Sequence, residues 1–240
     1  MKVTEFIDNK INRLPKGFVF TYDHFMKEVN SREAVIKALN RMVSKGKLAK
    51  LSKGRYYKPE RSVFGVLEPE QYQIVKDLIE KDSKPIGYVT GYGIYNSLGL
   101  TTQISSVIQI GRSTPRPSLK RGRYRISFVT QKNRITKENI PLLQILDAVK
   151  YIKKIPDTTV AKASVRLISI IEGLDVKDQN RIVRLAKKYP ASTRALLGAI
   201  LEYILGNQNR ELMNTLNPIT KYNINVDSRI LPTKSNWNIV

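Results

Sequence analysis

Hydrophobic residues near the start of the chain first follow the spacing of a helix and then that of a strand. The apolar positions that recur every three or four residues are Val3, Phe6, Ile7, Ile11 and Leu14. This spacing predicts a helix that ends before Pro15. The run 18–20 (FVF) predicts a short strand, and Tyr22–Val29 predicts a short helix with Thr21 as its N-cap.

The next segment, 31–45, carries both start and stop signals of a helix. Asn30 or Ser31 suits the N-cap, Glu33 lies in the first turn where the helix dipole favours a negative charge, and Gly46 suits the left-handed residue after the last turn. The apolar positions on one face are Val35, Ile36, Leu39, Met42 and Val43. The opposite face carries Arg32, Lys37, Asn40, Arg41, Ser44 and Lys45. The pattern predicts an amphipathic helix with a basic outer face.

Residues 46–59 (GKLAKLSKGRYYKP) predict a β-hairpin. Its turn is Lys53-Gly54, where Gly54 tolerates a positive φ. Strand alternation directs Leu51 and either Tyr56 or Tyr57 toward the domain. The basic side chains of the hairpin are Lys47, Lys50, Lys53, Arg55 and Lys58, and three of them lie near the tip. The order helix, strand, helix, helix, hairpin is the layout of a winged helix-turn-helix domain.

A connector is expected after the hairpin, in the stretch 60–70, because Gly65 and Pro69 interrupt the periodicity on either side of a short apolar run. This placement predicts two domains, 1–65 and 66–240. Helical periodicity then returns in the second half of the chain. The predicted helices are Pro141–Lys154, Thr158–Leu174, Lys177–Tyr189 and Ala191–Leu205.

The net charge of the chain indicates an anionic binding partner. The chain has 42 lysine and arginine residues against 20 aspartate and glutamate residues, a formal net charge of +22. Its hydrophobic content of 41% argues against a disordered basic tail. A folded chain of this charge repels itself, so an anionic partner is expected, nucleic acid first and an anionic membrane surface second.

Several other classes of site and location are disfavoured by composition. The chain has no cysteine and a single histidine, His24, which excludes disulfides, thiolate metal sites and histidine clusters. We expect neither a metal nor a cofactor. Residues 91–96 (GYGIYN) approach a dinucleotide-binding fingerprint, but Asn96 replaces the third glycine. The first ten residues lack the apolar core of a signal peptide, and Ala195–Leu205 is too short to span a bilayer. A cytoplasmic protein without a membrane partner is therefore expected.

The basic helix face and the hairpin are the first candidate site. A helix that enters the major groove needs an apolar back and long donors in front, and Arg32 and Lys37 are the expected base readers. Asn40 or Arg41 is expected to reach a base or a phosphate, and the hairpin to hold phosphates. The alternative is an ordinary solvated helix face. The complete set of expected DNA contacts is Ser31, Arg32, Lys37, Asn40, Arg41, Lys45, Lys47, Lys50, Lys53 and Arg55.

A second basic cluster is a candidate contact for DNA or for an acidic partner. Its members are Arg112, Arg116, Lys120, Arg121, Arg123 and Arg125. Alternation predicts that Arg123 and Arg125 share one face of a strand while Tyr124 and Ile126 face the core. Guanidinium groups suit phosphate and carboxylate pairing. The alternative is the charged face of a half-exposed sheet.

Three stretches carry a family resemblance. Residues 31–59 (SREAVIKALNRMVSKGKLAKLSKGRYYKP) resemble the N-terminal domain of the AbiEi-type antitoxins, transcriptional regulators of type IV toxin–antitoxin systems that act in abortive infection. Residues 87–105 (GYVTGYGIYNSLGLTTQIS) resemble the tyrosine-plus-short-helix element of that family. Residues 107–129 (VIQIGRSTPRPSLKRGRYRISFV) resemble its arginine-rich β-hairpin. The resemblance covers about residues 5–150, and after Gly206 the likeness is too loose to use.

The resemblance implies both a fold and a function. The fold is α+β, with an N-terminal winged helix-turn-helix domain followed by a mixed α/β domain with a β-hairpin and a C-terminal helical bundle. The function is that of a non-enzymatic repressor that binds double-stranded DNA at its own promoter. The C-terminal region would neutralise a nucleotidyltransferase-like toxin.

Two other functions remain open. The first is a stand-alone winged-helix regulator, or a protein-contact module, without a toxin. The second is a metal-dependent nuclease, because Pro156-Asp157 and Asp175-Val176-Lys177 match a PD…DxK pattern. Those carboxylates would need to meet on adjacent strands to share a cation, whereas the segment between them has helical periodicity.

Overall fold

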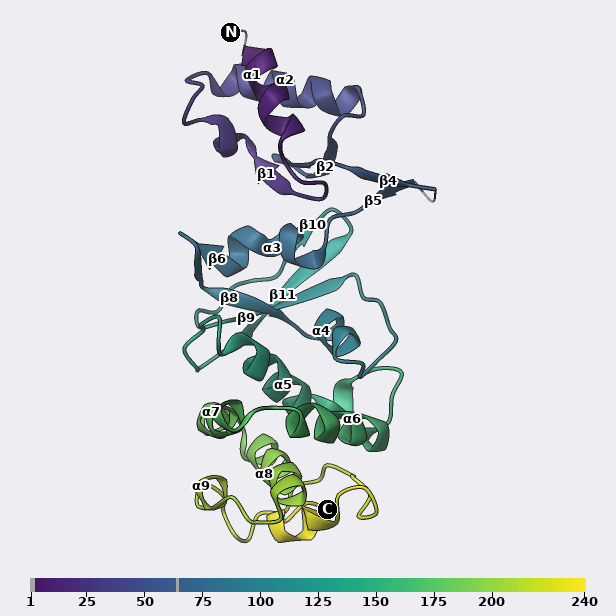
Figure 1. Ribbon diagram of the computed structural model, residues 1–240, viewed down its shortest axis with the longest axis vertical. Coiled ribbons are helices and arrows are strands. Elements are labelled where there is room, and N and C mark those ends of the chain that lie inside the picture. The colour runs from purple at the N-terminus through teal and green to yellow at the C-terminus, as the bar shows by residue number, and fades with distance from the viewer. Residues whose placement is uncertain (1–2, 64) are drawn as a thin grey trace. The chain divides into compact units, whose positions relative to one another are not determined.

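The computed structural model describes residues 3–63 and 65–240, and the chain divides into two compact units. Unit 1 consists of Met1–Asp77 and Leu119–Arg125, and unit 2 consists of Leu78–Ser118 and Ile126–Val240. Helices and several small sheets alternate along the chain, which confirms the expected α+β class (Figure 1). Unit 1 extends past the boundary predicted at residue 65 and also takes in a later hairpin.

Unit 1 begins with a helical layer packed on a small sheet. Its first helices are α1 (Val3–Asn12), the 3-10 helix η1 (Tyr22–Phe25) and α2 (Arg32–Ser44). The sheet consists of β1 (Val19–Thr21), β2 (Ala49–Ser52) and β3 (Arg55–Tyr57), in the order β1-β3-β2 with both pairs antiparallel. The buried side chains that join these elements include Ile7, Ile11, Phe20, Phe25, Val35, Leu39, Leu48 and Tyr56. Most of these apolar positions are the ones that set the helical and strand periodicities in the sequence.

Two segments of unit 1 differ from the prediction. The expected helix Tyr22–Val29 is only one 3-10 turn, because the amides of Glu28 and Val29 both donate to the carbonyl of Phe25 and close the segment as turns. The expected connector contains a β-hairpin, β4 (Glu60–Ser62) paired antiparallel with β5 (Gly65–Leu67). Phe64, in the expected apolar run, lies outside the described residues. The helix α3 (Gln71–Ile79) follows this hairpin.

The strands of unit 2 belong mainly to one sheet. They are β8 (Gly87–Thr90), β9 (Val107–Arg112) and most of β11 (Tyr124–Thr130), in the strand order β10-β11-β9-β8. The strand β10 (Leu119–Arg121) and the first residues of β11 count with unit 1. A two-residue pair, β6 (Glu80–Lys81) and β7 (Lys84–Pro85), precedes the sheet. Helices α4 (Tyr92–Ser97) and α5 (Ile140–Lys150) both pack on β8.

Helices make up most of the rest of unit 2 and pack around α8. The elements are η2 (Ile152–Lys154), α6 (Val160–Glu172), α7 (Val176–Ala186), α8 (Ala191–Leu205), α9 (Arg210–Met213) and η3 (Pro232–Trp237). Helix α8 contacts α5, α6, α7, α9 and η3, and the middle of the helix is therefore buried. Its predicted bounds are confirmed, and Gly206 follows it with a φ of 70°. The helix predicted at 141–154 is instead two pieces, α5 and η2.

None of the helices in the described part of the chain has the length and apolarity that crossing a membrane requires.

Candidate functional site

The ends of α2 are set by the residues that the sequence indicated. The hydroxyl of Ser31 accepts a hydrogen bond of 3.3 Å from the amide of Ala34, and Gly46 adopts a φ of 68°. Val35, Leu39 and Met42 are buried against the core of unit 1. Because its buried face is anchored in this way, α2 presents the opposite face to solvent.

That exposed face is polar and basic. Lys37, Asn40, Arg41 and Lys45 are all exposed. The Oδ1 atom of Asn40 accepts a 3.1 Å hydrogen bond from the hydroxyl of Tyr56, which lies on β3. The hairpin therefore orients a polar side chain of the helix, and the amide of Asn40 keeps its donors and one acceptor lone pair for a further contact.

Arg32 lies at the first position of α2 and is also exposed. Its guanidinium carbon is 4.4 Å from the centre of the Tyr22 ring, a stacked cation–π arrangement. Tyr22 thus restricts a side chain that would otherwise sample many rotamers.

The hairpin that follows α2 has the expected turn. Gly54 has a φ of 74°, a conformation open to glycine, and Lys53 and Lys50 are exposed. Leu51 and both tyrosines, Tyr56 and Tyr57, are buried, whereas only one tyrosine was expected to pack inward. The register between β2 and β3 shifts between Lys50 and Ser52, so Leu51 is an extra residue in β2, whereas Tyr56 and Tyr57 pair regularly with Lys50 and Ala49.

Two of the residues predicted to contact DNA form ion pairs within unit 1. The ammonium group of Lys47 lies 2.6 Å from Oδ1 of Asp8, and the guanidinium of Arg55 lies 2.8 Å from Oδ2 of Asp77. The basic side chains of α2, its C-cap and the hairpin that form no ion pair within residues 3–63 and 65–240 are Arg32, Lys37, Arg41, Lys45, Lys50, Lys53 and Lys58. Of these, Arg32 lies over the Tyr22 ring and Lys58 donates to the carbonyls of Asn12 and Leu14.

The residues of the second basic cluster are divided between the two units. Arg112 and Arg116 belong to unit 2, whereas Lys120, Arg121, Arg123 and Arg125 belong to unit 1. In unit 2, Arg112 donates to the carbonyl of Leu78 at 3.2 Å and Arg116 lies over the Phe128 ring. In unit 1, Arg123 pairs with Glu68 at 2.7 Å, and Lys120 and Arg125 are exposed.

Arg121 corrects the prediction most clearly, because its side chain is part of the core. The residue is 4% exposed and donates to both carboxylate oxygens of Asp77, at 2.5 and 2.7 Å, and to the carbonyl of Ile74 at 2.6 Å. Partial burial alone would raise the pKa of Asp77, but the guanidinium groups of Arg121 and Arg55 outweigh it and hold that pKa below its usual value. Arg121 therefore connects β10 to α3, and its guanidinium group is shielded from solvent.

Unit 2 contains a buried polar network centred on Asp147 of α5, which is 4% exposed. Its carboxylate accepts hydrogen bonds from the hydroxyls of Tyr88 at 2.8 Å, Thr90 at 2.9 Å and Tyr189 at 2.9 Å. The amide of Gln131 donates to both tyrosine hydroxyls at 2.8 Å. Burial raises the pKa of Asp147 above its ordinary value, although the three hydroxyl donors and the charge of Lys150 act in the opposite direction.

A glycine makes room for this network. Gly111 lies directly across from Tyr88 in the β8–β9 pair, and a Cβ at Gly111 would collide with the Tyr88 ring. The absence of a side chain lets the ring lie flat over β9 with its hydroxyl directed at Asp147. Burial and the neighbouring carboxylate raise the pKa of the Tyr88 hydroxyl, so it stays protonated and acts as a donor.

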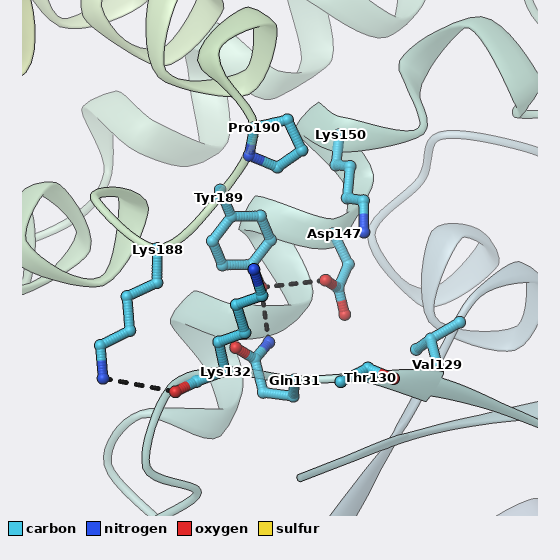
Figure 2. Close-up of a pocket in the computed structure, with 9 residues that line it drawn as sticks. All are labelled: Val129, Thr130, Gln131, Lys132, Asp147, Lys150, Lys188, Tyr189 and Pro190. Atoms are coloured by element: carbon cyan, nitrogen blue, oxygen red, sulfur yellow. Dashed lines mark hydrogen bonds between the residues drawn. The ribbon is translucent and has the colours of Figure 1, made fainter. Parts of the chain in front are cut away.

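A pocket of about 340 Å³ opens beside this network. Its lining residues are Val129, Thr130, Gln131, Lys132, Asp147, Lys150, Lys188, Tyr189 and Pro190. Figure 2 shows Asp147, Tyr189 and Gln131 joined by hydrogen bonds, with three lysines from three different segments around them. Sequence reasoning missed this pocket, because its residues are scattered over sixty positions and no periodicity or motif connects them.

The nuclease pattern does not form a metal site. Asp157 and Asp175 lie on either side of α6, whose 13 residues span about 20 Å at the standard rise. The side chain of Asp175 instead caps α7 by accepting from the amide of Asp178 at 2.7 Å. Within the described ranges, no three His, Cys, Asp or Glu side chains are grouped so that they could hold a metal ion.

Comparison with known proteins gives one family and one fold. No curated protein matches this chain. The structure is similar to the crystal structure of the RV2827C protein from Mycobacterium tuberculosis, with a TM-score of 0.55, 13% sequence identity, and coverage of 90% of this chain and 82% of that one. At this identity the likeness concerns the fold alone. A family model matches residues 6–185, and the chain accordingly belongs to DUF6088, a family of unknown function.

Proposed function

We propose that unit 1 is a winged helix-turn-helix module and that the protein is a DNA-binding transcriptional regulator. In this proposal α2 is the recognition helix and the β2–β3 hairpin is the wing. The order α1, β1, η1, α2, β2, β3 supports it, as does the three-stranded sheet that closes the helical layer.

The observation that carries the proposal is a set of unneutralised cations on two consecutive elements. Lys37, Arg41 and Lys45 belong to α2 and its C-cap, and Lys50 and Lys53 to the hairpin. Each is exposed, and none meets a carboxylate within the described part of the chain. An ordinary solvated helix face would carry charges of both signs, so this arrangement favours an anionic partner.

The two elements would contribute differently. Lys37, Asn40 and Arg41 occupy one stripe of α2 and have donors long enough to reach base edges in a major groove. Lys50 and Lys53 would contact phosphates and position the domain without reading sequence. If all five cations neutralise phosphates, the logarithm of the affinity falls with the logarithm of the salt concentration with a slope of about −4.5.

The wider role in the proposal is that of an antitoxin which represses its own operon. The support is the resemblance of residues 31–59, 87–105 and 107–129 to AbiEi-type antitoxins. The expected partners are the promoter of its own gene and a nucleotidyltransferase-like toxin encoded beside it. Co-expression of the full chain with such a neighbouring gene product should restore growth, and persistent growth arrest would limit the proposal to DNA binding.

A mobility-shift titration tests the DNA-binding function. The fragment upstream of the gene should bind more tightly than a random fragment of the same length at physiological salt. Asn40→Ala should relax this preference, and Tyr56→Phe should do so partially, because it removes only the hydroxyl that orients Asn40. Lys53→Ala should weaken binding to both fragments alike and reduce the salt slope by about one.

The matched control is Lys221→Ala, which removes an exposed positive charge from unit 2. It should leave the preference and the slope unchanged if contacts from unit 1 dominate. Equal affinity of the unaltered protein for the two fragments would reject sequence-specific regulation.

A further inference from the structure

The pocket beside Asp147 is lined by three lysine side chains that form no ion pair in the described part of the chain. Lys132 and Lys188 are exposed and Lys150 is half-buried, and none of them forms an ion pair within residues 3–63 and 65–240. The ammonium group of Lys188 donates to the carbonyl of Lys132 at 3.3 Å, and that of Lys150 lies 4.8 Å from the centre of the Tyr151 ring. Three cations therefore line one concave site that also contains one carboxylate, Asp147, with which none of them forms an ion pair.

The side chains of Gln131 and Tyr189 already form hydrogen bonds within the protein. Gln131 uses its Nε2 to donate to two tyrosine hydroxyls and its Oε1 to accept from the amide and the side chain of Asn133. Tyr189 donates to Asp147 and accepts from Gln131. The side-chain hydrogen-bonding capacity left for a ligand is mainly that of the ammonium groups and the exposed hydroxyl of Thr130, together with the last lone-pair position of Asp147. A ligand that suits this site must supply acceptors and negative charge.

The negative charge of Asp147 does not prevent an anionic ligand from binding in the pocket. Its carboxylate accepts hydrogen bonds from three hydroxyl groups. The three ammonium groups around the pocket outnumber it (Figure 2). The network also fixes the pocket floor, because Asp147, Tyr189 and Gln131 belong to three different segments that these hydrogen bonds hold together. The site is thus rigid at its base and cationic at its rim.

From this geometry we propose that the pocket of unit 2 binds a small phosphate monoester. Ammonium groups from three segments line the pocket, and their charge and donors suit the charge and the several acceptor oxygens of a phosphate group. The volume of about 340 Å³ is at the lower end of the range for small-molecule sites, which leaves room for a body of sugar size. This ligand site lies entirely within unit 2 and is independent of the DNA-binding function proposed for unit 1.

Calorimetric titration of the full chain with ribose 5-phosphate tests the proposal, with ribose as the uncharged comparison. Saturable binding of the phosphorylated sugar in physiological salt is expected, and no binding of ribose. Lys132→Gln and Lys150→Gln should each weaken binding about tenfold, the usual effect of losing one charge-assisted hydrogen bond. Both side chains reach solvent, so neither substitution opens the core.

Lys177→Gln provides the matched control, because it removes an exposed charge from α7 of the same unit, away from the pocket lining. Its affinity should stay within about twofold of the unaltered protein. Equal weakening by Lys177→Gln and Lys150→Gln would overturn the proposal, since the phosphate would then respond only to the net charge. Absence of saturable binding, or binding of ribose with similar affinity, would overturn it too.

Discussion

Each unit contains an aspartate that accepts several internal hydrogen bonds, and the two are stabilised in opposite ways. In unit 1, Asp77 meets the guanidinium groups of Arg121 and Arg55, and its pKa is lowered despite its partial burial. In unit 2, Asp147 meets the neutral hydroxyls of two tyrosines and a threonine, and burial raises its pKa. A basic protein therefore does not automatically neutralise its buried acids with cations.

The difference shows what each arrangement depends on. The pair in unit 1 depends on charge, and it occupies an arginine that would otherwise add to the positive surface. The network in unit 2 depends on shape, because Gly111 must leave room for the Tyr88 ring and several segments must converge on one carboxylate. We therefore expect the two sites to respond differently to substitution and to pH.

The largest effect should follow Asp147→Ala. This change leaves the hydroxyls of Tyr88, Thr90 and Tyr189 buried without their acceptor, at a cost of about 4 kcal/mol of unfolding free energy. Differential scanning calorimetry should show a fall in melting temperature of about 8–16 °C. The control is Glu172→Ala, which removes an exposed carboxylate from α6 and should cost no more than about 0.5 kcal/mol. Similar losses for both variants would contradict a structural role for the network.

A smaller effect is expected for Arg121→Met in unit 1. The substitution keeps an apolar chain in the core but leaves the carbonyl of Ile74 without its donor and Asp77 with Arg55 alone. Urea unfolding should show a loss of about 2–3 kcal/mol, less than for Asp147, because Asp77 remains half-exposed to water. Arg125→Met changes an exposed arginine on the neighbouring strand and should lie within about 0.5 kcal/mol of the unaltered protein. An equal loss of unfolding free energy for the two substitutions would contradict a buried, structural role for Arg121.

The last prediction concerns how the free energy of unfolding changes with pH. Because the pKa of Asp147 is raised on folding, its contribution to stability is complete below about pH 3.9, the value for an unfolded chain, and declines as the pH rises through the folded pKa. The lowered pKa of Asp77 gives the opposite sign, with a contribution present above about pH 3.9 and lost as the pH falls through the folded value.

Asp147→Asn and Asp77→Asn, each compared with the unaltered protein in urea titrations across this pH range, separate the two contributions. The two stability differences should change with pH in opposite directions. Slopes of the same sign would show that the two aspartates are not stabilised by different means.

Local signals in the sequence were sufficient for much of the fold. The cap was predicted at Asn30 or Ser31, and the structure places it at Ser31. The positive φ of Gly46 and Gly54 and the alternation of residues 124–126 between core and solvent were also predicted and are confirmed. Each depends on a residue and its near neighbours, and such effects are readable from sequence. The α+β class follows from the same signals.

The features that the sequence did not reveal depend on contacts between residues that are far apart along the chain. Nothing in the residues around Arg121 distinguishes it from Arg123 or Arg125, because its burial depends on Asp77, more than forty positions away. The pocket has the same origin, since Lys132, Lys150 and Lys188 are ordinary members of a large set of basic residues until the chain folds. The predicted DNA contacts Lys47 and Arg55 likewise have partners in α1 and α3 that only the fold brings close.

The single tryptophan of the chain gives unit 2 a spectroscopic signature of its own. Trp237 is 1% exposed, its ring lies against Gly198 of α8, and its indole nitrogen donates to Glu202 at 2.6 Å. Indole emission selectively excited at the red edge of its absorption therefore originates in unit 2 alone. A denaturation curve followed by this emission reports when the helices around α8 open, while far-ultraviolet circular dichroism averages over both units. Any divergence between the two curves would measure directly how independently the two units melt.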